Sequence, residues 1–126
     1  MTLFSTLGKF AQSNRSFAAI FKSFPFPPTG DDGVVYGINQ SDAQFVITSQ
    51  NLLHKLNNLS SKLKNLHTIV YIRNEKSDSS SVVRELKDKN LQVYSYDEVE
   101  TNGAKLPAWE VPPPSPEDLA IIMYTR

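Results

Sequence analysis

The chain has 126 residues, 40% of them hydrophobic, which suits one folded domain or part of one and is too apolar for an intrinsically disordered chain. Its 13 basic and 13 acidic side chains cancel, so the net charge gives no reason to expect a nucleic acid or an anionic membrane as a partner. The sequence contains no cysteine, which excludes disulfides, thiolate zinc sites and cysteine nucleophiles, and no apolar run of the roughly 20 residues that cross a bilayer.

The first thirty residues divide into two predicted segments. Residues 1–8 are a short β-prone run that ends at a glycine, and we expect a strand there; the run lacks the features of a secretory signal. Residues 9–30 are expected to be a poorly ordered insertion, because the Phe–Pro alternation at 24–28 can continue neither a helix nor a central strand. A membrane-contacting role for residues 17–28 is an alternative, although this stretch is short for an amphipathic helix.

Regular structure is predicted from residue 31 onward. A helix is expected to start near residue 41, with Asn39 or Ser41 as its N-cap. A polar loop is expected at 74–81, and the five prolines between 106 and 116 predict an extended connection. Strands are predicted at 45–49, 68–72, 91–95 and 121–123, and helices at 52–66, 82–87 and 96–100.

The order of these elements predicts the fold class. Strands that alternate with helices at this spacing are typical of parallel βαβ units, in which right-handed crossovers place helices against the sheet. The near-continuous apolar runs at 45–47, 69–72 and 121–123 are typical of strands covered on both faces. The predicted fold is therefore α/β, a partial parallel βαβ layered sheet.

A series of leucines marks the predicted helix at 52–66. From Leu52 the leucines at 56, 59, 63 and 66 are spaced by four, three, four and three residues, which places them on one helical face. Packing against the sheet is the favoured interpretation. A dimer zipper is the alternative, but two heptads are fewer than a stable coiled coil needs.

The residue types that carry acid–base or metal chemistry are scarce and scattered. His54 and His67 lack further ligands at metal-binding spacing and lack a nucleophile and acid that would complete a triad. The carboxylate pairs at 31–32, 97–98 and 117–118 are adjacent in sequence, so they point in different directions and are interpreted as turn residues and solvated charge. We therefore predict no catalytic and no metal-binding residues in this chain.

The last residues carry the most specific pattern. A proline-rich connection leads to residues 118–125, Asp-Leu-Ala-Ile-Ile-Met-Tyr-Thr, and then to Arg126. An apolar strand that runs into a threonine is the layout that precedes a phosphate-binding turn, in which glycines let backbone N–H groups approach the phosphates.

This segment resembles the run before the phosphate loop of the acyl-adenylate-forming (AMP-binding) synthetases, and among them it is most similar to the long-chain fatty-acid–CoA ligases. In that family Ser-Gly-Thr-Thr-Gly follows, whereas this sequence has Arg126. Residues 2–8 joined directly to 31–39 resemble the family's strand, glycine turn and helix start, and residues 45–53 resemble its next strand and helix. The resemblance covers residues 2–8 and 31–125, so it implies a partial AMP-binding-type domain at 31–126, truncated at the phosphate loop.

The resemblance implies a function for the family and a reduced role for this chain. The family uses ATP to convert a long-chain fatty acid to an acyl-adenylate and then transfers the acyl group to coenzyme A, with magnesium assisting the phosphates. Of the ATP-binding loop only Thr125 is a candidate binding residue here. We therefore expect an incomplete N-terminal subdomain that is inactive alone and binds none of ATP, CoA and magnesium by itself.

The resemblance also implies a location and leaves one alternative function. It predicts the cytoplasm, or the cytosolic face of the endoplasmic reticulum or other membranes, with fatty acid, ATP and CoA as the partners of the family. A small non-catalytic α/β interaction or regulatory module, associated with a full-length synthetase, is the alternative.

Residues 9–30 and Arg126 depart from the family pattern, and one hypothesis explains both departures. Gly8 and Lys9 can be encoded by GGT-AAG, which contains a splice-donor sequence, and Thr29 and Gly30 can be encoded by ACA-GGN, an acceptor after pyrimidine-rich codons. The codons of Thr125 and Arg126 followed by a stop can contain another donor. The hypothesis is that both segments are translated from retained introns.

Overall fold

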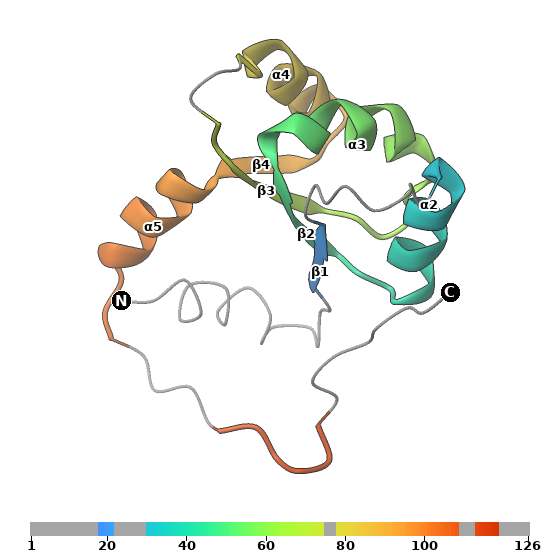
Figure 1. The fold of residues 1–126 in the computed structure, drawn as a ribbon. Coiled ribbons are helices and arrows are strands. Elements are labelled where there is room, and N and C mark those ends of the chain that lie inside the picture. The colour runs from blue at the N-terminus through green and yellow to red at the C-terminus, as the bar shows by residue number, and fades with distance from the viewer. Residues whose placement is uncertain (1–17, 22–29, 75–77, 109–112, 119–126) are drawn as a thin grey trace.

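The computed structural model describes residues 18–21, 30–74, 78–108 and 113–118 (Figure 1). The predicted strands at 1–8 and 121–123 lie outside these residues. The described elements are β1 (Ala18–Phe21), α2 (Asp31–Gln40), β2 (Phe45–Ser49), α3 (Leu53–Leu59), β3 (Thr68–Ile72), α4 (Ser80–Asp88), β4 (Gln92–Ser95) and α5 (Tyr96–Ala104). Short 3₁₀ turns at Gln50–Leu52 and Ser60–Lys62 flank α3.

The strands form one parallel sheet, which confirms the predicted α/β class. The order is β1-β2-β3-β4, and in register Val46 lies opposite Ile69, which in turn lies opposite Val93. β1 pairs with β2 from Ala18 opposite Phe45 to Phe21 opposite Thr48. β1 lies within residues 9–30, so four residues of the predicted insertion form the edge of the described sheet.

The helices are divided unequally between the two faces of this sheet (Figure 1). Buried side chains of α2, α3 and α4 share one cluster with inward-facing residues of β2, β3 and β4. α5 contributes Val99 to a second cluster on the other face of the sheet. This cluster also contains Phe45, Ile47 and Val70. Because successive strand residues point to opposite faces, Val46 belongs to the first cluster, whereas Phe45 and Ile47 belong to the second.

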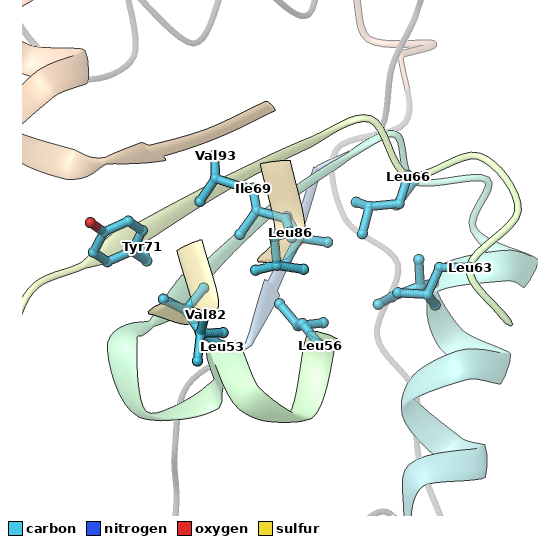
Figure 2. Packing of buried hydrophobic residues seen from close by; sticks show 12 residues of the cluster. Leu53, Leu56, Leu63, Leu66, Ile69, Tyr71, Val82, Leu86 and Val93 are labelled. Atoms are coloured by element: carbon cyan, nitrogen blue, oxygen red, sulfur yellow. The ribbon is translucent and has the colours of Figure 1, made fainter. Parts of the chain in front are cut away.

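The larger cluster forms the core of the fold (Figure 2). Fully burying a leucine or valine side chain stabilises a fold by about 1.5–3 kcal/mol, so this face supplies most of the stabilisation within the described residues. Its members are Ile38, Ala43, Val46, Leu53, Leu56, Leu63, Leu66, Ile69, Tyr71, Val82, Leu86 and Val93.

The prediction of a helix start at Asn39 or Ser41 is wrong. The helix ends there instead: it begins after Gly30, whose carbonyl oxygen accepts hydrogen bonds from the N–H groups of Gly33 and Val34. Ser41 is the C-cap residue and its hydroxyl donates to the carbonyl oxygen of Gly37 (2.8 Å). A serine can cap either helix end in this way, since its hydroxyl also bonds to preceding carbonyl groups, and the sequence pattern alone does not separate the two uses.

The predicted helix at 52–66 is shorter than its leucine pattern indicates. α3 and its second 3₁₀ turn end at Lys62, where the side-chain amide of Asn39 donates to the carbonyl oxygen of Lys62 (2.9 Å). The carbonyl oxygen of the Asn39 side chain accepts from the N–H of Lys64 (3.1 Å). Leu63 and Leu66 therefore reach the core from an extended segment, and their burial confirms that the leucines pack against the sheet.

Candidate functional site

The carboxyl edge of the parallel sheet is the candidate site, because all four strands end there and the loops that follow carry polar side chains. The strands end at Phe21, Ser49, Ile72 and Ser95. In open α/β sheets, ligands bind outside the carboxyl ends of the strands.

Gln50 joins three loops at the edge. It follows β2 directly, is 6% exposed, and its Nε2 donates to the Ser79 hydroxyl (2.9 Å) at the start of α4. Its Oε1 accepts from the N–H of Asn74 after β3 (2.6 Å). The amide therefore ties the ends of β2 and β3 to α4. Sequence reasoning missed this role, because a glutamine in a loop has no pattern that identifies partners 24 and 29 residues away.

Two hydroxyls at the end of β2 lack a hydrogen-bond partner. Thr48 Oγ1 and Ser49 Oγ are buried, and neither makes a hydrogen bond. They point to opposite faces, since they are consecutive in a strand. Unpartnered buried hydroxyls cost stability, so these two residues are the least well satisfied polar groups in the described part of the edge.

The helix starts at this edge are stabilised locally. Ser95 and Glu98 form a capping box at α5: the Ser95 hydroxyl accepts from the N–H of Glu98 (3.2 Å), and the Glu98 carboxylate accepts from the N–H of Ser95 (2.8 Å). The Ser-x-x-Glu spacing is a local sequence signal that can predict this cap. Before α4, Asp78 accepts from the N–H of Ser80 (2.9 Å), and this bond, together with one from the Ser80 hydroxyl, lowers the pKa of the Asp78 carboxyl.

A separate polar cluster lies between α3 and α4, away from the strand ends. The Asn57 side-chain amide donates to Glu85 Oε2 (2.6 Å). Lys89 Nζ donates to the carbonyl oxygen of Asn57 (3.0 Å), to its Oδ1 (2.7 Å) and to the Ser60 hydroxyl (3.1 Å). The groups of this cluster hydrogen-bond to one another, so their role is to hold α3 and α4 together.

The residues that the sequence singled out remain apart. His54 and His67 are both exposed; His54 lies in α3, whereas His67 lies in the loop directly before β3. The residues of the three adjacent acidic pairs are all exposed, which confirms their interpretation as surface charge. The interpretation as turn residues is confirmed only for 117–118, because the pairs at 31–32 and 97–98 lie in the first turns of α2 and α5. Within the described ranges no group of three His, Cys, Asp or Glu side chains could hold a metal ion. Thr125 lies outside the described residues.

These observations define the class of the molecule: a parallel βαβ unit of an open α/β domain, with a polar carboxyl edge. No protein-family model matches the chain, and no solved structure matches it. Among curated proteins it is similar to long-chain-fatty-acid–CoA ligase 1 of Schizosaccharomyces pombe, with 28% identity over 96 residues. It is also similar to long chain acyl-CoA synthetase 8 of Arabidopsis thaliana, with 32% identity over 97 residues.

Each alignment covers 76% of this chain, but the chain spans only 14% and 13% of the length of the two relatives. Both relatives support the resemblance to long-chain acyl-CoA synthetases. Within the described residues, no helix has the length and apolar character that a membrane span requires.

Proposed function

We propose that this chain is part of the N-terminal, adenylate-forming region of a long-chain fatty-acid–CoA ligase of the AMP-binding superfamily. The observation that carries the proposal is the similarity to two long-chain acyl-CoA synthetases over 96 and 97 residues. The parallel βαβ order of the described strands is compatible with it. In such a ligase, ATP and a fatty acid give an acyl-adenylate and pyrophosphate, and the acyl group then passes to coenzyme A.

The chain by itself is proposed to be inactive. The proposal rests on position 126, where this sequence carries an arginine and the family has the serine of its phosphate loop. Within the described residues no group of three His, Cys, Asp or Glu side chains could hold a metal ion, so the proposal assigns magnesium to none of them. Thr125, as the first hydroxyl of the loop, would contribute one donor to a phosphate.

A segment exchange tests the family assignment. Residues 31–125 of this chain replace the aligned segment of the S. pombe ligase, and the hybrid is assayed for ATP- and CoA-dependent formation of acyl-CoA. Activity within about tenfold of the parent supports the proposal, because only a segment with the same fold and the same junctions would position the remaining loop. A folded hybrid without activity overturns it. The matched control is the same hybrid with Leu86→Asp, which places a charge in the core and is expected to be inactive.

The purified chain tests the second part of the proposal. Acyl-CoA formation by the chain alone would overturn the proposed inactivity. Copurification with a full-length synthetase would instead favour the alternative, a non-catalytic module that acts by association. Fractionation of cells that produce the chain checks the proposed location in the cytoplasm or at the cytosolic face of membranes.

The transcript tests the retained-intron hypothesis. We expect GGT-AAG at codons 8 and 9, and a shorter spliced form that joins codon 8 to codon 31. Ser-Gly-Thr-Thr-Gly encoded in the next exon would support both the hypothesis and the family. Other codons at Lys9 and Arg126, or the absence of a spliced form, would overturn the hypothesis and leave the family assignment to the segment exchange.

A further inference from the structure

The position of α5 determines where the sheet can grow. The strand order β1-β2-β3-β4 follows the chain, and α2, α3 and α4 all lie on one face. The three crossovers therefore share one hand, as parallel crossovers do in about 98% of cases. α5 lies on the opposite face, where Val99 packs against Phe45, Ile47 and Val70. A helix on the opposite face with the same crossover hand reverses the direction in which the next parallel strand is added.

The next parallel strand would therefore be added on the side of β4 that faces β1, and no longer beyond β4. α5 starts directly after β4 and contacts β3 as well as β4, so it extends over the neighbour of β4 on the side toward β1. β2 and β3 have neighbours on both sides. Among the described strands, the first edge that a further parallel strand could occupy on this path is therefore the outer edge of β1.

The sequence of β1 contains none of the residues that usually protect a sheet edge. Its four residues, Ala-Ala-Ile-Phe, include no lysine, no proline and no other charged residue. Natural edge strands usually carry such residues or are covered, because an unprotected edge pairs with other strands. Beyond α5 the sequence contains one apolar run with strand character, residues 121–123.

We propose that the outer edge of β1 is a docking site for one further parallel strand and that residues 121–123 of this chain supply it. The strand would run toward the carboxyl edge and end beside Phe21. The direction of strand addition reverses at this point, and open α/β sheets bind their ligands at such a reversal. Insofar as the proposed ligase function holds, Thr125 would then lie at the carboxyl edge near the end of β1.

Cysteine pairs test this proposal cleanly, because the chain contains no cysteine of its own. Ala19→Cys is combined in turn with Ile121→Cys, Ile122→Cys and Met123→Cys. Paired strands lie about 4.8 Å apart, within the Cα separation of about 4.4–6.8 Å that a disulfide spans. We expect cross-linking under mild oxidation at only one of the three positions, the residue directly opposite Ala19. Its neighbours in the strand face the other side of the sheet, and a residue two positions away lies about 7–8 Å from Ala19, beyond the reach of a disulfide.

Two control series complete the test. The same three cysteines are combined with Tyr94→Cys on β4, the other edge of the sheet, and Ala19→Cys is combined with Leu3→Cys in the predicted strand at 1–8. Preferential cross-linking in either series overturns the proposal, and so does the absence of a cross-link to Ala19→Cys. Each reduced variant must show the cooperative urea unfolding of the parent chain, and Ala18→Cys replaces Ala19→Cys if the latter does not fold.

The cross-linking experiment and the segment exchange test the topology and the ligase function separately. Cross-linking reports strand order alone, so a correct strand order combined with an inactive segment exchange would reject the function and keep the topology. An active segment exchange without cross-links would reject the proposed strand order and keep the ligase function.

Discussion

The two faces of the sheet differ in how completely helices cover them. α2, α3 and α4 each connect two parallel strands, so each must cross one face, and together they bury Leu53 and Leu86 to 0% exposure. On the other face α5 follows the last described strand and covers β3 and β4, and the cluster there has four buried members. The three helices that connect parallel strands therefore build the core, whereas α5 covers only part of the other face of the described sheet.

The largest loss of stability is expected from a substitution on the face that α2, α3 and α4 cover, which we call the crossover face. Leu86→Ala removes a side chain that is fully buried between α4 and the sheet, and the cavity should reduce the free energy of unfolding by about 3–4 kcal/mol. Urea unfolding followed by circular dichroism measures the loss. The neighbouring exposed substitution Lys87→Ala should change it by less than about 0.5 kcal/mol. A similar loss for both variants would contradict the assignment of the core.

A matched pair of valines compares the two faces directly. Val93 on β4 is 2% exposed in the crossover cluster, and Val99 on α5 is 7% exposed in the smaller one. Each Val→Ala removes two methyl groups, about 0.8 kcal/mol per group for transfer alone. We expect about 2 kcal/mol for Val93→Ala and about 1 kcal/mol for Val99→Ala, because the less enclosed site relaxes more easily. Equal losses, measured by the same unfolding experiment, would mean that α5 encloses its face as fully as the crossover helices do.

A substitution of Thr48, on the crossover face, is expected to change the free energy of unfolding in the opposite direction. Its buried hydroxyl has no partner, so Thr48→Val removes an unsatisfied group and keeps the shape of the side chain. The free energy of unfolding should stay unchanged or rise by about 1 kcal/mol. A loss of more than about 1 kcal/mol would show that the hydroxyl is bonded in solution, for example to a buried water molecule.

The α5 cap is the next smaller effect. Ser95→Ala removes the hydroxyl that accepts the Glu98 N–H, and loss of such a cap costs about 1 kcal/mol. The exposed substitution Thr101→Ala on the same helix is the control. If the cap stabilises α5 alone, amide hydrogen exchange should accelerate in α5 and stay unchanged in α3 and α4. Uniform acceleration would instead mean that α5 unfolds together with the crossover face.

The sequence predicted the strands of this fold better than its helix ends. The apolar runs at 45–49 and 68–72 are strands at the predicted residues, because β-branched residues buried on both faces leave a continuous pattern. The helix boundary at Ser41 was wrong because the same side chain can bond at either end of a helix. β1 was not predicted as a strand, since Ala18 and Ala19 have little strand preference and their pairing with β2 depends on a partner distant in sequence.

The candidate site was less predictable than the fold for a related reason. Gln50, Ser79 and Asn74 meet only because parallel strands bring their carboxyl ends to one edge, and no local spacing encodes that meeting. The capping box at Ser95 is the exception, since its two residues are three apart and their pattern is local.

The smallest expected effect concerns the turn that leads into α4, where the Asp78 carboxylate accepts a hydrogen bond from the N–H of Ser80. Hydrogen bonds from Ser80 hold the pKa of Asp78 below its ordinary value of 3.8, so the carboxylate form is favoured in the folded state. Its stabilising contribution is complete above the unfolded pKa and is lost as the pH falls through the lower folded value. Asp78→Asn should therefore lower the urea midpoint slightly at pH 7, and the difference from the parent chain should shrink as the pH approaches 2. A difference that persists unchanged at low pH would assign the effect to the shape of the side chain, since charge would then contribute nothing to this turn.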